Sequence, residues 1–139
     1  VMPNANAVLL SIFSKISLIL SDQKYVQAQD NLVNKFIKRI SNQYFGITSF
    51  LKNYNLIEQS QLIVVAGKDR GENAIIHKKI YENYLDNIMV FIIDTETKLD
   101  KAFKFYKNIN VTEITSIYIC KNNTCSLPFT DINLLKEYL

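Results

Sequence analysis

The fold is decided by the stretch Leu62-Ile-Val-Val-Ala-Gly67, a continuous apolar run that ends at a glycine. A short run of this kind is typical of a strand that is buried on both faces of a sheet. A second such run, Ile88-Met-Val-Phe-Ile-Ile93, follows a segment whose apolar residues have helical spacing, Glu72–Tyr84. A strand, a helix and a strand within about thirty residues predict a βαβ unit with parallel strands and a right-handed crossover.

Downstream of this unit, the pattern predicts one more helix, a hairpin and a terminal helix. Leu99–Tyr106 has the spacing of a weaker helix. The two strands Thr115–Cys120 and Cys125–Phe129 would be joined by a short loop, and Thr130 or Asp131 would cap a helix over Asp131–Leu139. The order after residue 60 is therefore β-α-β-α-β-β-α, which is the order of a thioredoxin-like core and equally of other small α/β sheets.

The first sixty residues have helical periodicity throughout. Apolar residues three and four apart predict helices over Ala7–Leu20, Tyr25–Ile40 and Tyr44–Tyr54. Because the connection Ser21–Lys24 is short, the first two helices should be antiparallel neighbours. We therefore predict an α/β protein in which antiparallel helices, residues 1–60, pack with a small mixed sheet, residues 61–139.

Composition and charge exclude some classes of protein. The chain has 139 residues, 48% of them hydrophobic, which suits one compact unit or two small packed layers. Its net charge is +3, and the basic groups Lys35–Arg39 and His77–Lys79 are expected to be solvated helix faces rather than a nucleic-acid footprint. The apolar run Ala7–Leu20 is shorter than the roughly 20 residues that a membrane span requires. We expect neither nucleic acid nor membrane as a partner.

Cys120 and Cys125 are the chemically distinctive pair. In the predicted hairpin they oppose each other directly, so their sulfurs can meet. A redox pair would need a cation or helix terminus to stabilise one thiolate, and Lys121 should point to the opposite face. Zinc would need more ligands, and His77 is the only histidine. We interpret the pair as packing residues or a disulfide, keep redox function as the alternative, and expect no metal or other cofactor. Two cysteines without a secretory leader favour a cytoplasmic protein.

The loop Gly67-Lys-Asp-Arg-Gly71 is a candidate anion-binding loop. It follows a strand and leads into a helix, so backbone amides near Gly67, Lys68 and Gly71 can receive an anion. It matches neither GxxxxGK[ST] nor GxGxxG, and a strand-to-helix turn commonly carries glycine for geometric reasons alone. In a thioredoxin-like core the same loop would carry a CxxC motif, which is absent here. The acid pair Asp94 and Glu96 has no partner that the sequence identifies.

Four blocks carry a resemblance to a known family: Met2-Pro-Asn-Ala-Asn-Ala-Val8, Tyr25–Lys38, Leu62–Gly67 and Ile117-Tyr-Ile-Cys-Lys-Asn-Asn-Thr-Cys125. They resemble the C-terminal part of the uncharacterised, thioredoxin-domain-containing proteins of the spermatogenesis-associated protein 20 type. In that family a thioredoxin-like domain precedes an (α/α) barrel akin to six-hairpin glycosidases and sugar epimerases. The resemblance implies that residues 1–60 end the barrel and that residues 61–139 form an α/β appendage. Asn6 matches the family's pattern at the first block and is the candidate cavity-lining residue.

The expected function follows from the lack of a complete catalytic set. We expect a non-catalytic structural or binding portion of a larger thioredoxin-domain protein, whose partners are upstream domains of the same polypeptide. The alternatives are a thiol-disulfide redox module that uses Cys120 and Cys125, or part of a carbohydrate-active enzyme of the six-hairpin type. Helices separated from a barrel expose apolar faces, so we also expect a homo-oligomer formed through Val8–Leu20 or Leu32–Ile40.

Overall fold

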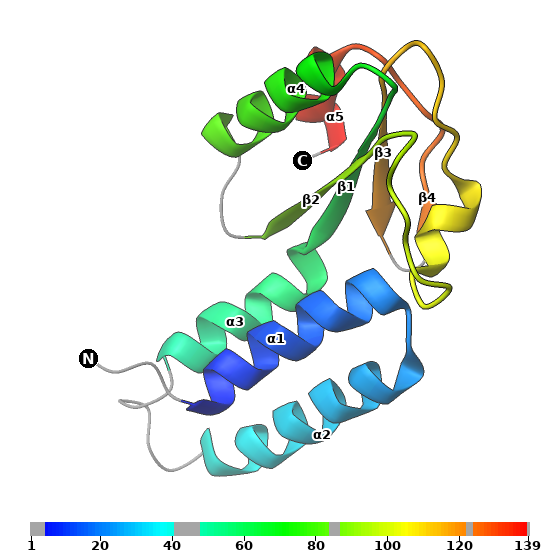
Figure 1. Ribbon diagram of the computed structural model, residues 1–139. Coiled ribbons are helices and arrows are strands. Elements are labelled where there is room, and N and C mark those ends of the chain that lie inside the picture. The colour runs from blue at the N-terminus through cyan, green and yellow to red at the C-terminus, as the bar shows by residue number, and fades with distance from the viewer. Residues whose placement is uncertain (1–4, 41–47, 84–86, 122–123, 139) are drawn as a thin grey trace. The chain divides into compact units, whose positions relative to one another are not determined.

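The computed structural model describes residues 5–40, 48–83, 87–121 and 124–138 (Figure 1). Over these ranges the chain is mixed α/β, as the sequence predicts, and it contains a small four-stranded mixed sheet. The chain divides into two compact units, Val1–Ser60 and Gln61–Leu139. Each unit has a hydrophobic core of its own.

The first unit is helical. Its elements are α1 (Ala5–Leu20), α2 (Gln23–Ile40) and α3 (Thr48–Gln59). Helix α1 packs against both of the others, and its buried residue Leu10 shares a core with Phe50. The ring of Phe36 stacks on that of Phe50, with the centroids 4.3 Å apart. The predicted start of the third helix falls at residues 44–47, which lie outside the described ranges.

A tight turn joins α1 and α2, and two residues explain it. Ser21 has a φ of 53°, the left-handed conformation that ends many helices, and its N–H donates to the Ser17 carbonyl at 2.9 Å. Asp22 then accepts the Lys24 N–H at 2.9 Å and so caps the start of α2. One helix therefore ends and the next begins with only two residues between them.

The second unit contains the sheet. Its strands are β1 (Gln61–Ala66), β2 (Ile88–Ile93), β3 (Ser116–Lys121) and β4 (Thr124–Cys125), in the spatial order β2-β1-β3-β4. Strands β1 and β2 are parallel and are connected through α4 (Arg70–Asn83), which confirms the predicted βαβ unit. Strand β3 is antiparallel to β1, and β4 is antiparallel to β3, which confirms the hairpin.

Strand β1 is the buried centre of this sheet: residues 62–66 are all inaccessible to solvent. One face of the sheet packs against α4 and the short C-terminal helix α5 (Leu135–Tyr138), which follows a 3₁₀ helix, η2 (Ile132–Leu134). On the other face, the ring of Phe91 contacts Phe103 and Phe105, with centroid distances of 6.0 and 5.5 Å. The buried residues of the first face are Ile63, Val65, Ile76, Ile80, Ile117, Ile119 and Leu135.

The prediction of a helix over Leu99–Tyr106 is wrong. This segment contains a turn followed by a 3₁₀ helix, η1 (Lys104–Asn108). Asp100 closes the turn, because its side chain accepts the Ala102 N–H at 2.8 Å. Phe103 and Phe105 then both contact Phe91, and residues two apart cannot share a face of an α-helix.

The last predicted strand and helix are also shorter than expected. Strand β4 ends at Cys125, and beyond it the pairing continues through a hydrogen bond between Ser126 and Ile119 and an isolated bridge between Phe129 and Ile117. The register shifts by one residue between these pairs, so Leu127 and Pro128 together lie opposite Tyr118 as a bulge, which interrupts the ladder. The terminal helix begins as 3₁₀ after Asp131, whose side chain accepts the Asn133 N–H at 2.9 Å.

Candidate functional site

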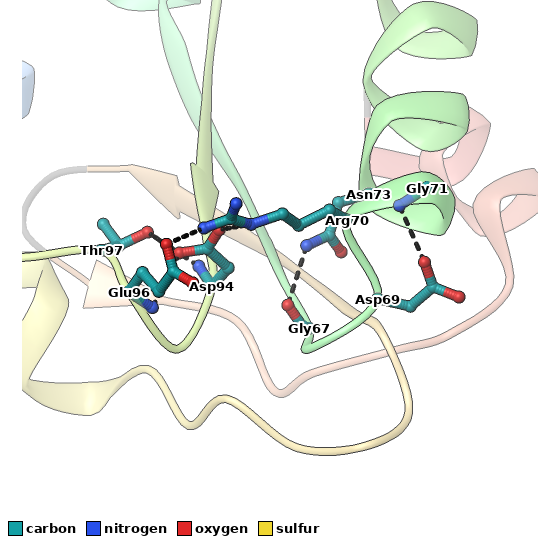
Figure 2. Close-up of polar contacts among 8 residues, drawn as sticks. All are labelled: Gly67, Asp69, Arg70, Gly71, Asn73, Asp94, Glu96 and Thr97. Carbon is teal, nitrogen blue, oxygen red and sulfur yellow. Dashed lines mark hydrogen bonds and ion pairs between the residues drawn. The ribbon is translucent and has the colours of Figure 1, made fainter.

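The polar groups of the second unit gather at the carboxyl ends of β1 and β2. Because the two strands are parallel neighbours, the loops that follow them meet at the same edge of the sheet. Arg70, at the start of α4, reaches across to the loop after β2 (Figure 2). Its Nε donates to Asp94 Oδ2 at 2.6 Å, and its Nη2 donates to Glu96 Oε2 at 2.5 Å. Two carboxylates therefore hold the guanidinium, and both raise the pKa of Arg70. The hydrogen bond with Glu96 has the larger effect, followed by the one with Asp94.

Asp94 is the most connected carboxylate at this edge. Thr97 Oγ1 donates to Asp94 Oδ1 at 2.6 Å, and the Glu96 N–H donates to the same oxygen at 3.0 Å. The hydrogen bond from Thr97, followed by those from Arg70 and the Glu96 amide, holds the pKa of Asp94 below its ordinary value, against the opposing effect of desolvation. Asp94 is thus kept ionised as one half of a structural ion pair.

Thr97→Val is expected to raise the pKa of Asp94 toward its ordinary value, because the variant lacks the hydroxyl that donates to the carboxylate. A carboxyl group whose pKa is lower in the folded than in the unfolded state stabilises the protein at pH values above its unfolded-state pKa. This contribution is lost as the pH falls through the folded-state pKa. The variant should therefore lose less stability on acidification than the parent. Carboxyl-carbon NMR titration measures the pKa directly, with Thr95→Val in the same turn as control. An unchanged or lower pKa of Asp94 would contradict this assignment.

A buried hydrogen-bonded cluster fixes the loop between β1 and α4. The Asn73 side chain is fully buried; its Nδ2 donates to the Gly67 carbonyl at 2.8 Å, and its Oδ1 accepts from Thr115 Oγ1 at 3.2 Å. The Gly67 N–H donates to the Ile93 carbonyl at 3.1 Å. Asn73 therefore joins the start of α4 to the loop that precedes it and to the residue before β3.

The candidate anion-binding loop carries internal partners. The Asp69 side chain caps α4: its Oδ1 accepts the Gly71 N–H at 2.7 Å (Figure 2). It also accepts the Glu72 N–H at 3.1 Å. Lys68 Nζ pairs with Glu113 Oε1 at 2.5 Å. An anion would have to displace the Asp69 carboxylate from the helix terminus, so anion binding through Gly67, Lys68 and Gly71 stays a prediction that this geometry does not favour.

The two cysteines form a disulfide at the opposite end of β1. Cys120 and Cys125 are direct cross-strand partners, as predicted, and their sulfurs are bonded. The Ser126 N–H donates to the Ile119 carbonyl at 2.8 Å, and the Ile119 N–H donates to Ser126 Oγ at 3.1 Å, so the backbone groups of these two residues face each other. The adjacent cysteines therefore occupy a non-hydrogen-bonded pair, in which side chains approach most closely. Leu62, at the start of β1, lies opposite Cys120 in the register.

Asn6 and His77 are the remaining candidate residues. Asn6 is half-buried in the first turn of α1, in the other unit, and its predicted role in a cavity stays a prediction. His77 is half-buried on α4 and its ring contacts Tyr81, with the centroids 4.7 Å apart.

Among the described residues, no group of three or more His, Cys, Asp and Glu side chains is arranged to hold a metal ion. None of the helices in these ranges has the length and apolarity needed to cross a membrane.

Comparison with known proteins adds no relative: no family model, curated protein or solved structure matches the chain. The candidate site is therefore interpreted from its own geometry.

The sequence analysis did not predict two features of the candidate site, the Arg70 ion pairs and the Asn73 cluster. The parallel βαβ pattern could have indicated the Arg70 ion pairs, because Arg70 and Asp94 each follow a strand of the same unit. Asn73 lies on the helical stripe of Ile76 and Ile80, so a polar residue at a core position was the signal for the second.

Proposed function

We propose that the chain is a non-catalytic structural or binding portion of a larger thioredoxin-domain protein, with the first unit derived from a helical barrel. The observation that carries the proposal is the state of the cysteines, the residues best suited to chemistry. They are joined to each other across the β3–β4 hairpin, and Cys120 is only 4% exposed.

The strand pattern supports a thioredoxin-like appendage without thioredoxin chemistry. The spatial order β2-β1-β3-β4, with β1 and β2 parallel and the last two strands antiparallel, is compatible with such a core. The loop after β1, where that fold would carry a CxxC motif, holds Lys68, Asp69 and Arg70 instead. All three side chains are engaged in ion pairs or in capping α4.

The surroundings of the disulfide also disfavour thiol exchange. An external thiolate must attack one sulfur and expel the other as a thiolate. Cys125 is the more exposed of the two, so attack there would expel the thiolate of Cys120. Cys120 is buried opposite the fully buried Leu62, and an apolar setting disfavours a thiolate. The disulfide is thus suited to hold β4 on the sheet.

Slow reduction of the native disulfide tests this proposal. We expect dithiothreitol to reduce the bond in the folded protein more slowly than in guanidinium chloride, by on the order of a hundredfold. Alkylation of the free thiols followed by mass spectrometry gives both rates. Comparable rates would contradict the proposal, and catalysed reduction of insulin disulfides by the reduced chain would instead support the redox module.

A variant without the bridge serves as the control. Cys120→Ala/Cys125→Ala removes a cross-link between residues only five apart, so the free energy of unfolding should fall by about 2 kcal/mol. The fold should be retained, because the hairpin keeps the bonds of Ile119 with Ser126 and of Ile117 with Phe129. Circular dichroism and urea denaturation measure both quantities.

A further inference from the structure

Strand β2 forms one edge of the sheet (Figure 1). Within the described ranges its outer side pairs with no other strand, whereas the opposite edge, β4, is two residues long and is bridged to β3 by the disulfide. The six residues of β2 are all apolar and include no charge or proline, the features that usually protect an edge from further pairing. Ile92 is 38% exposed. This edge is therefore an unprotected template for another strand.

The hydrogen bonds to β1 show which backbone groups of β2 point outward. The Gln61 N–H donates to the Asn87 carbonyl at 3.0 Å, and the Gly67 N–H donates to the Ile93 carbonyl at 3.1 Å. Bonds in a parallel ladder alternate along the strand, so the odd-numbered residues of β2 direct their backbone groups toward β1. The backbone N–H and C=O groups of Ile88, Val90 and Ile92 consequently point to the outer side of β2, opposite β1.

We propose that a second copy of this chain pairs with the β2 edge in the antiparallel direction, about a twofold axis at Val90. In this register Val90 lies opposite the partner's Val90, and Ile88 lies opposite the partner's Ile92. All three outward residues then form hydrogen-bonded pairs, each of which exchanges both N–H···O bonds. An identical strand gives every outward N–H and C=O group of β2 a hydrogen-bond partner. This is the self-complementarity that a twofold interface requires.

The side chains are as compatible with this pairing as the backbone. The intervening pair places Met89 opposite the partner's Phe91, so every cross-strand pair within β2 is apolar and no like charges meet. The next described charge along the chain, Asp94, lies beyond the paired residues and is already bound by Arg70. Pairing through one short strand buries little area, so the dimer belongs to the weak class, with a Kd on the order of 100 μM.

Sedimentation equilibrium of the whole chain tests the proposal. The parent is expected to dimerise with rising concentration, and Ile92→Lys should weaken the dimer at least about tenfold by placing a charge on the edge. Ile114→Lys is the matched control, since Ile114 is 66% exposed and lies outside β2; it should dimerise like the parent. Circular dichroism verifies that both variants fold.

Cross-linking tests the register. Val90→Cys should form a disulfide-linked dimer under mild oxidation, because the two substituted residues face each other, while Ile114→Cys should not. A parent that is monomeric at about 1 mM, ten times the expected Kd, would overturn the proposal. So would a dimer that Ile92→Lys leaves intact and Leu9→Lys in α1 abolishes, since the interface would then be the exposed helical face expected from the sequence.

Discussion

Gly67→Ala is expected to destabilise the second unit by about 3 kcal/mol or more. A Cβ at this position would overlap the Thr115 side chain and would come within 2.9 Å of both the Thr115 Cα and Asn73 Oδ1. The backbone at Thr115 leads directly into β3 and is buried, so it cannot move away without disturbing the sheet. The glycine is required by close approach, since its φ is not positive.

Gly71→Ala is the matched control for this prediction. Position 71 is exposed in the first turn of α4, and a Cβ there meets only the Asp69 carboxylate, at 3.1 Å. Because alanine is the better helix former, the change should alter stability by less than about 1 kcal/mol. Urea denaturation followed by circular dichroism compares the two variants. Equal and small effects at both positions would show that the loop after β1 is not packed as described.

Asn73→Asp is expected to destabilise the protein by about 3 kcal/mol at neutral pH, although the side chain keeps its size. The amide donates to the Gly67 carbonyl, and a carboxylate in its place would present an acceptor to another acceptor. It would also bring a charge into a fully buried position. Both effects act against the cluster that fixes the start of α4.

The pH dependence distinguishes charge from shape in this variant. Burial should raise the folded-state pKa of the introduced carboxyl above its unfolded value. The destabilisation caused by the charged carboxylate is then complete at pH values above the folded-state pKa. It becomes smaller as the pH falls toward about 3.9, the ordinary pKa of an aspartate side chain. The measured quantity is the difference in unfolding free energy between parent and variant across this range. Asn110→Asp, an exposed position, should cost less than about 0.5 kcal/mol at any pH. A cost at position 73 that does not change with pH would refute the electrostatic explanation.

The sequence predicted the elements whose signal is local. The continuous apolar runs of β1 and β2 follow from burial on both faces, and the spacing of Cys120 and Cys125 follows from the geometry of a hairpin. The helix predicted over Leu99–Tyr106 failed because apolar spacing alone does not reveal that Phe103 and Phe105 both contact Phe91. That contact depends on which strand lies beneath the segment.

The candidate site was less predictable than the fold because its contacts join distant parts of the sequence. Arg70 meets Asp94 and Glu96 only because β1 and β2 are adjacent and parallel, and neither residue type signals this by itself. Asn73 was hidden for a different reason. A buried amide is tolerated where its hydrogen bonds are complete, and its partners, Gly67 and Thr115, come from two different loops.

The central position of β1 has a consequence for how the protein is made. Leu62–Ala66 leaves the ribosome before either neighbouring strand, yet it pairs with β2 on one side and with β3 on the other. Until both have been synthesised, this strand, which is fully buried in the folded unit, has unpaired edges in water. Pairing that spans so much sequence is slow, and exposed strands of this kind aggregate. Leu62–Ala66 is therefore the segment that a chaperone would shield on the nascent chain.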